Sequence, residues 1–460
     1  MLASAANIAG RFALNDWRAG LSNGPARLSL CCALALAVAT PQAASAAVAP
    51  SSAAQSIRGE TIDTFYAARD YPPLWIGESD DAALALIDLV RSARIDGLDP
   101  DFYRPIDLER AVRAARSGDP RDIGRADRML SEAFVAYVRD LKHRPKVEMI
   151  WVDTQLLPAT PSPRRLLESA AAASSLEAYL VDMPWMNPIY AGLRQALANG
   201  SDNNAAERDL LRLNLERARA LPAAKGKYVI VNASAAQLSM YEDGRLVDSM
   251  RVVVGKPANP TPMMAALIRF TSLNPYWNVP ADLAAERVAP HVVKEGHAYL
   301  EAKGYQLLSS WEDDAHVVSP DTVDWVAVAE GRTQVRLRQL PGPANAMGKM
   351  KFMFPNAQGI YLHDTPDKNL LGEAARMFSG GCVRLEDASR LAEWLYDGNA
   401  PTTTSARPEQ RVDLPRPVPV FLTYLTAIPN GGSVAFLPDV YDRDPAALAT
   451  LDGARILASR

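Results

Sequence analysis

Cysteine is scarce in this sequence, which has three copies in 460 residues. Cys31 and Cys32 lie together near the start of the chain, and Cys382 stands alone in the stretch SGGCVR. Histidine is also scarce, and its five copies are scattered: His143, His291, His297, His316 and His363. A protein zinc site needs a cluster of such ligands. The sequence offers no such cluster, so we expect neither a metal nor another cofactor.

An excess of basic residues is also missing. The formal net charge is −4, and it becomes slightly more negative if residues 1–46, with three arginines and one aspartate, are removed. Proteins that bind nucleic acid usually present a basic face, so we expect no nucleic-acid partner. Hydrophobic residues make up 48% of the chain and charged residues 22%, which is typical of a globular protein with a buried core.

No apolar run is long enough for an ordinary membrane span. After Arg27 comes a run of about a dozen apolar residues, whereas a transmembrane helix needs roughly 20. Ala44-Ser45-Ala46 then supplies small residues, as at a signal-peptide cleavage site. We expect residues 1–46 to be a signal peptide and 47–56 a flexible start. The protein would be exported to the periplasm or cell wall, with no stable membrane span after cleavage. An uncleaved anchor is the alternative.

Removal of the signal peptide would leave Cys382 as the single cysteine. An odd cysteine in an exported protein suggests a reactive thiol. A buried, inert cysteine is the alternative. The neighbouring residues disfavour it, because two glycines and an arginine do not make an apolar strand or helix face.

The rest of the chain is long enough for two or three domains, and its patterns predict an α+β multidomain protein. Apolar residues recur at helical spacing between residues 57 and 222, which predicts an all-α domain. The individual helices are expected at residues 84–98, 125–141, 162–180 and 206–221. Ser162 followed by Pro163 is typical of a helix start.

From residue 223 to 445 the pattern predicts a mainly-β domain. Asp243-Gly244 between two Val-rich runs indicates a hairpin. Further strands are expected at residues 269–280, 333–340, 359–365 and 417–428, with a helix at 387–398. Residues 401–417 are predicted to be a surface loop, and 446–460 a C-terminal tail.

A catalytic cysteine needs a base or a cation beside it, because the thiolate is the nucleophile. His363 lies 19 residues before Cys382 at the end of a strand-like run, so it could meet Cys382 on a neighbouring strand end. A structural histidine is the alternative. Gly380 and Gly381 could present backbone N–H groups to an oxyanion, although two glycines also suit an ordinary tight turn.

The stretch HDTPDKNLLGEAARMFSGGCVRLEDASRLAEWL closely resembles the active-site segment of L,D-transpeptidases with a YkuD-type catalytic domain. FYAARDYPPLWIG and RSARIDGLDPDFY resemble the helical scaffold of the large, YcbB-like members. The resemblance covers most of residues 57–445. It implies an all-α scaffold domain followed by a mainly-β catalytic domain, in which residues 281–325 form a lid insertion over the cleft.

The resemblance also implies a two-step acyl transfer. Cys382, activated by His363, would attack a peptidoglycan tetrapeptide stem, release D-Ala, and pass the acyl group to a second stem in a 3→3 cross-link. Carbapenem-type inhibitors are expected to acylate the same thiol. The resemblance assigns oxyanion or support roles to Ser379, Gly380, Gly381 and Tyr361, and candidate substrate contacts to Arg384, Trp277, Asn278 and Tyr305.

The sequence departs from the family pattern in two ways. Many members have a histidine two residues before the cysteine, where this chain has Gly380, so the base must be His363 alone. Fewer than thirty residues separate Tyr190 from Arg217, which leaves no room for the small peptidoglycan-binding module of many large members.

Other outcomes stay open from the sequence. Water could resolve the thioester, which would make an L,D-carboxypeptidase, or a lysine of another protein could, which would make a wall-anchoring ligase. An inactive wall-binding scaffold is a third possibility, although Cys382 and His363 are both present. Papain-like and NlpC/P60-like peptidases place the cysteine before the histidine, which is the reverse of the order here.

Overall fold

The computed structural model describes residues 62–458, apart from 78, 143, 144, 146, 201–203, 224, 313 and 404. The predicted signal peptide and flexible start lie outside these described residues. Within the described part of the chain, no helix combines the length and the apolar character needed to cross a bilayer.

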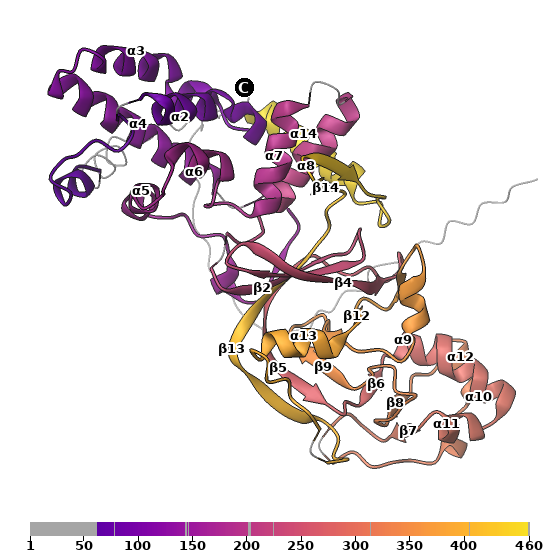
Figure 1. Cartoon of the computed structure of the whole chain (residues 1–460). Helices are drawn as coiled ribbons and strands as arrows, with labels where there is room; N and C mark the ends of the chain where they lie inside the picture. Colours follow the sequence, from indigo (N-terminus) through magenta and orange to yellow (C-terminus); the bar gives the residue numbers. More distant parts are fainter. Residues whose placement is uncertain are drawn as a thin grey trace, which may run out of the picture. The chain divides into compact units, whose positions relative to one another are not determined.

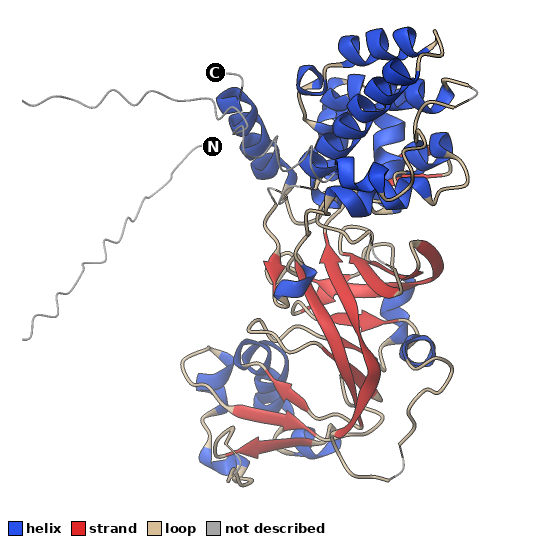
Figure 2. Cartoon of the chain, turned by 90° about the vertical axis from the view of Figure 1, so that its left-hand side faces the viewer, coloured by secondary structure: helices blue, strands red, loops and turns tan. Residues whose placement is uncertain are grey.

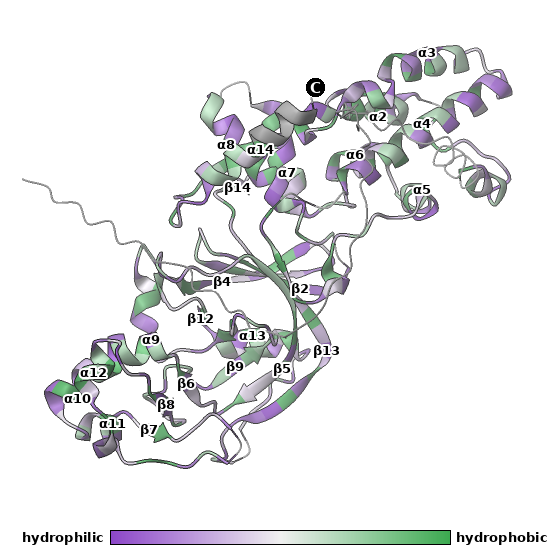
Figure 3. Ribbon diagram, turned by 180° about the vertical axis from the view of Figure 1, so that it is seen from behind, coloured by the Kyte–Doolittle hydropathy of each residue, from purple (hydrophilic) through white to green (hydrophobic). Residues whose placement is uncertain are grey.

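Helices dominate the first half of the chain and strands the second (Figure 1, Figure 2). The helices of the first half are α2 (Asp81–Arg91), α3 (Pro105–Ala115), α4 (Pro120–Leu141), α5 (Pro163–Ala171), α6 (Leu176–Asp182), α7 (Pro188–Asn199) and α8 (Ala205–Ala218). Figure 3 shows hydrophobic and hydrophilic residues interspersed along them. The predicted helical domain is therefore confirmed, with short 3₁₀ segments between its helices.

The single helix expected at residues 162–180 is wrong in one respect, because the chain forms two helices there. α5 ends at Ala171, and α6 begins after Ser175, whose side chain accepts a hydrogen bond from the Ala178 N–H. A serine at this position satisfies an otherwise unpaired amide and starts a new helix. The alanine-rich pattern concealed that break.

One buried carboxylate ties the start of the helical domain to α4. Asp127 accepts hydrogen bonds from the backbone N–H groups of Leu74, Trp75 and Ile76 at 2.6–3.1 Å, and from the Tyr66 hydroxyl. Burial and the neighbouring Asp127 raise the pKa of Tyr66 well above its usual value, so the phenol remains a donor.

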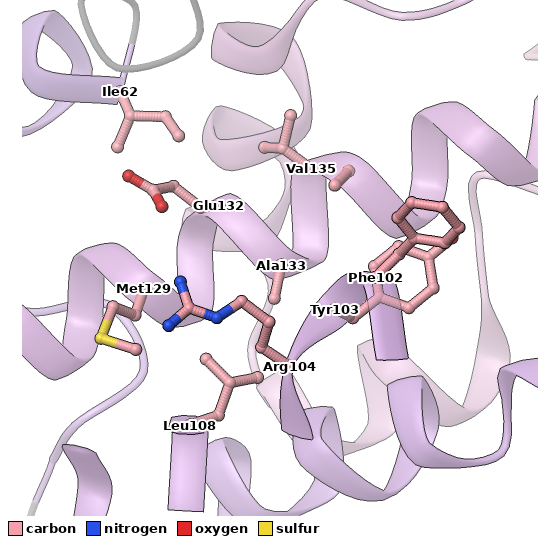
Figure 4. Close-up of a pocket in the computed structure, with 10 residues that line it drawn as sticks. Ile62, Phe102, Tyr103, Arg104, Leu108, Met129, Glu132, Ala133 and Val135 are labelled. Atoms are coloured by element: carbon pink, nitrogen blue, oxygen red, sulfur yellow. The ribbon is translucent and has the colours of Figure 1, made fainter. Parts of the chain in front are cut away.

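A cavity of about 300 Å³ opens in the helical domain beside α4. Figure 4 shows Glu132 and Arg104 among mostly apolar side chains that include Ile62, Met129 and Val135. Burial and the nearby Asp63 raise the pKa of Glu132. All of its lining residues belong to the helical domain.

A large mixed sheet is built from the second half of the chain and from one short strand at residues 150–151, within the region predicted as helical. Its strand order is β1-β5-β13-β2-β3-β4-β12-β10-β9, with β11 paired to β4. β9 also pairs with β5, so the run from β5 to β9 forms a closed ring of pairings. The strands are β1 (Ile150–Trp151), β2 (Lys227–Asn232), β3 (Gln237–Glu242), β4 (Arg245–Gly255), β5 (Met264–Leu273), β9 (Met350–Met353), β10 (Leu362–His363), β11 (Met377–Ser379), β12 (Val383–Leu385) and β13 (Gln410–Thr423).

The hairpin expected at Asp243-Gly244 joins β3 to β4, and both turn residues have positive φ, as a type I′ turn requires. The surface loop expected at residues 401–417 is wrong in its last part, because β13 already begins at Gln410. Residues 410–413 pair with β5, and the ladder shifts register between Asp413 and Val418. Pro415 and Pro417 lie in that irregularity, where no N–H is needed for the ladder.

The predicted insertion folds as a small unit with its own hydrophobic core, from Val279 to Leu337. Its sheet has the order β6-β8-β7, with β6 (Trp277–Val279), β7 (Tyr305–Leu308) and β8 (Arg336–Gln339). Its helices are α9 (Ala281–Leu283), α10 (Ala289–Glu295), α11 (Ala298–Ala302) and α12 (Trp325–Ala329), and a π-helical turn covers Ala284–Val288. The unit therefore extends beyond residue 325, the end of the predicted insertion.

The remaining elements follow Cys382 in the chain. α13 (Ala388–Leu395) confirms the helix expected at 387–398, and β14 (Ala427–Asn430) pairs with β15 (Ser433–Phe436). The predicted tail is helical, since α14 spans Asp444–Ala458. At its start, the buried Asp444 forms a 2.7 Å ion pair with Arg217 of α8.

We predict that Asp127→Ala lowers the free energy of unfolding by about 3 kcal/mol or more, because it leaves buried donors without an acceptor. Chemical denaturation followed by far-ultraviolet circular dichroism measures the change. Asp88→Ala is the matched control: its side chain is 73% exposed and pairs with Arg91, so its effect should stay below about 1 kcal/mol. Equal effects of the two variants would contradict a structural role for the Asp127 network.

Candidate active site

The parallel pairing of β10 with β12 brings His363 and Cys382 together. Leu362 lies opposite Val383 and His363 lies opposite Arg384, and the Val383 N–H donates to the Tyr361 carbonyl at 3.1 Å. Leu362 and Val383 are fully buried in the core. Because side chains alternate along a strand, the residues on either side of them face the other way. Tyr361, His363, Cys382 and Arg384 therefore share one face.

Cys382 is part-buried, and its Sγ lies 3.6 Å from the Gly359 carbonyl oxygen. Burial raises the pKa of its thiol to about 11. Hydrogen bonds from the backbone and hydroxyl of Tyr361, and the positive charges of Arg384 and Lys351, act in the opposite direction on that pKa. The resting group is thus a neutral thiol beside donors and cations that favour its thiolate.

His363 is 2% exposed, and its Nδ1–H donates to the Asp364 carbonyl at 2.6 Å. That bond fixes the tautomer and leaves Nε2 with a lone pair. Burial, with Arg384 and Lys351 nearby, lowers the pKa of His363 to about 3, so its imidazole is neutral at ordinary pH. Among the described residues, no hydrogen bond joins it to Cys382.

Two cations flank this face. Lys351 of β9 lies opposite His363, and its Nζ is 3.1 Å from Glu409. Arg384 is the candidate substrate contact or loop brace, and its side chain is 11% exposed. Its Nη1 lies 3.5 Å from Asp367, while its buried Nε has no partner. The contact with Asp367 therefore links β12, which holds Arg384, to the segment that follows β10.

The loop of residues 378–382 holds the candidate nucleophile Cys382 and is called the nucleophile loop below. One of its backbone N–H groups already has an acceptor. The Gly381 N–H donates to Ser379 Oγ at 3.1 Å, and Ser379 Oγ in turn donates to the Cys382 carbonyl at 2.5 Å. Gly381 has a φ of +117°, which favours glycine. The backbone N–H groups of Gly380 and Cys382, on either side of Gly381, have no partner in the described structure.

The other candidate substrate contacts lie in the insertion. Trp277 and Asn278 belong to β6 and Tyr305 to β7, and the rings of Trp277 and Tyr305 are 6.4 Å apart. Burial and the neighbouring Tyr299 raise the pKa of Tyr305 to about 12. The structure therefore places Trp277, Asn278 and Tyr305 in the same small sheet of the insertion.

The insertion also contacts the nucleophile loop directly. Arg287 Nη2 donates to the Phe378 carbonyl at 3.2 Å. A Cβ placed on Gly380 would lie 3.4 Å from Leu283 Cδ1. Lys256 Nζ, beside the same loop, pairs with Glu286 at 2.7 Å. Sequence reasoning missed Lys351, Arg287 and Lys256 as site neighbours. Only the strand register and the packing of the insertion reveal them.

Two domain families match the chain in the same order as the two halves of the fold. The model of the scaffold domain matches residues 60–197, and that of the L,D-transpeptidase catalytic domain matches residues 226–414. Residues 226–414 therefore form an L,D-transpeptidase catalytic domain. The resemblance noted from SGGCVR is thereby confirmed, as is the expected class of enzyme.

One curated relative and two solved structures were found to be similar to this chain. A Haemophilus influenzae protein assigned as an L,D-transpeptidase is 27% identical over 391 residues, which are 82% of this chain and 77% of the relative. An L,D-transpeptidase from Mycobacterium smegmatis is 15% identical, with coverage of 43% of this chain and 58% of that one and a TM-score of 0.21. L,D-transpeptidase 3 from Mycobacterium tuberculosis, solved with a faropenem-derived adduct, is also 15% identical. The match covers 43% of this chain and 60% of that one, with a TM-score of 0.21. The chain thus spans about three fifths of these two solved chains.

The raised pKa of Cys382 predicts a specific pH dependence for alkylation. In the folded protein, the rate with iodoacetamide should rise about tenfold per pH unit from pH 7 to 9, because the thiolate fraction grows below a pKa of about 11. Peptide mass spectrometry of the Cys382 fragment measures this rate. The denatured chain should level off near pH 8.5–9. A rate in the folded protein that is flat across neutral pH would indicate a thiolate–imidazolium pair instead.

Proposed function

We propose that this protein is an exported L,D-transpeptidase that uses Cys382 as its nucleophile and forms 3→3 cross-links between peptidoglycan stems. The observation that carries the proposal is the β10–β12 register, in which a neutral histidine with a fixed tautomer shares a sheet face with the thiol. Export by residues 1–46 would bring the enzyme to the wall.

The first step is acylation of the thiol. The Cys382 proton passes to His363 Nε2 as Sγ attacks the carbonyl that precedes the terminal D-Ala of a tetrapeptide stem. The C–N bond breaks, the proton on His363 goes to the departing amine, and D-Ala leaves. Arg384 and Lys351 support this step, since both charges favour the thiolate.

The second step regenerates the enzyme. The amine of the diaminopimelate residue in another stem attacks the thioester, its proton passes to His363, and Cys382 Sγ leaves with the proton returned. Water in place of that amine would give a carboxypeptidase, and a protein lysine would give an anchoring ligase. The insertion supports transfer to an amine, because a unit that contacts the nucleophile loop can exclude water from the thioester.

We predict that the mature protein, incubated with purified disaccharide-tetrapeptide, yields a dimer that lacks one D-Ala. Mass spectrometry reads the product directly. Free tripeptide would instead indicate hydrolysis of the thioester, and unchanged substrate would contradict both transfer and hydrolysis.

Three variants test the roles of the residues. Cys382→Ala should give no product. His363→Ala should slow turnover by about 10²- to 10⁴-fold, because it removes the general base. His316→Ala, which alters an exposed histidine of the insertion, should leave turnover unchanged.

A carbapenem should acylate the same thiol. Attack on its strained lactam opens the ring without a leaving group, so the expected adduct has the full mass of the drug. Intact-mass spectrometry should show one adduct on the mature protein and none on Cys382→Ala. An adduct on both proteins would place the reaction elsewhere.

A further inference from the structure

We propose that the loop of residues 255–261 orients the oxyanion hole, with Thr261 as its main positioning residue and Tyr441 as its brace. This inference rests on the proposed function, because it concerns the acylation of Cys382. The oxyanion would be held by the N–H groups of Gly380 and Cys382, the two backbone donors of the nucleophile loop that have no partner in the described structure.

Thr261 controls the direction of the Cys382 N–H. Its buried Oγ1 donates to the Gly381 carbonyl at 2.8 Å and accepts from the Gly255 N–H at 2.9 Å. The Gly381 carbonyl and the Cys382 N–H belong to one peptide unit, and in a trans peptide they point in opposite directions. The hydroxyl of Thr261 therefore holds the carbonyl on one side and turns the Cys382 N–H to the other.

At the other end of the loop, Lys256 fixes the direction of the Gly380 N–H in the same way. The Lys256 N–H donates to the Ser379 carbonyl at 2.9 Å. That carbonyl shares a peptide unit with the Gly380 N–H, which must again point the other way. Both free donors thus lie on peptide units whose carbonyls are held by the loop of residues 255–261. The Gly381 peptide between them is turned toward Ser379.

The loop itself is tightly constrained. A Cβ on Gly255 would come within 2.2 Å of the Asn259 carbonyl oxygen and 2.6 Å of the Thr261 nitrogen, so only glycine fits. The Asn259 N–H donates to the Lys256 carbonyl at 2.9 Å and closes the turn. A loop this compact can fix the two carbonyls together.

A segment outside the matched catalytic domain braces the loop. The Tyr441 hydroxyl donates to the Gly255 carbonyl at 2.7 Å, and Arg443 Nη2 donates to the Thr261 carbonyl at 3.2 Å. The ring of Tyr441 stacks on that of Tyr424 at 5.2 Å. Residues 441–443 thus hold both ends of the loop, although the family match ends at residue 414.

A comparison of two reactions of the same thiol tests this role. Acylation by a carbapenem or a tetrapeptide develops an oxyanion, whereas alkylation by iodoacetamide does not. Thr261→Val keeps the side-chain shape and removes the hydroxyl. It should slow acylation about 10- to 100-fold, through kcat rather than KM, because a misdirected oxyanion donor weakens the transition state. The alkylation rate at fixed pH should stay within about twofold of wild type.

Three further variants complete the experiment. Thr261→Ser, which retains the hydroxyl, should restore most of the acylation rate. Tyr441→Phe should slow acylation less than Thr261→Val and also spare alkylation. Thr423→Val removes a buried strand hydroxyl that has no partner among the described residues. It is the matched control and should change neither rate.

The outcomes separate the two proposals. If wild-type protein is not acylated at all, the proposed function fails. If wild type reacts but Thr261→Val is acylated equally fast, the positioning role is overturned. It is also overturned if Thr261→Val slows alkylation as much as acylation, because that result means a general disturbance of Cys382. Circular dichroism of each variant confirms that it is folded.

Discussion

The parallel alignment of two very short strands, β10 and β12, determines the rest of the site. With Leu362 opposite Val383 in the core, His363 and Cys382 must share the other face. A slip of one residue would turn the histidine into the core and the leucine out of it. The fully buried apolar pair therefore specifies the register, and the register specifies the chemistry. The long crossover between the strands is a necessity of parallel pairing.

Burial and charge act against each other around the thiol. Burial disfavours both the thiolate of Cys382 and the imidazolium of His363, and it shifts their pKa values in opposite directions. Arg384 and Lys351 favour the thiolate but further disfavour the imidazolium. The resting pair is consequently neutral, and in the proposed acylation charge would separate only as a substrate carbonyl takes up the developing charge. The donors of the nucleophile loop then matter more than they would beside a preformed thiolate.

Sequence reasoning predicted the features that depend on residues close together in the chain. The rarity of cysteine, the glycines before Cys382 and a histidine at a strand end predicted the candidate site, and the structure places His363 and Cys382 on neighbouring strand ends. The alternation of Val and Ile predicted the sheet, and helical spacing predicted the scaffold. Non-local features were out of reach: Lys351 faces His363 only because β9 pairs with β10, and Thr261 reaches Gly381 across 120 residues. The early start of β13 was missed because the segment contains prolines. They lie where the strand pairing shifts register, so the missing N–H groups do not disrupt the ladder.

These long sequence separations have a consequence for folding. The contacts of Thr261 with Gly381, Tyr441 with Gly255 and Asp444 with Arg217 span 120 to 227 residues. Contacts of high sequence separation close late, because the entropy of large loops must be overcome first. The braced loop of residues 255–261 should therefore form late in folding, so the proposed acylation of Cys382 would require the fully folded chain.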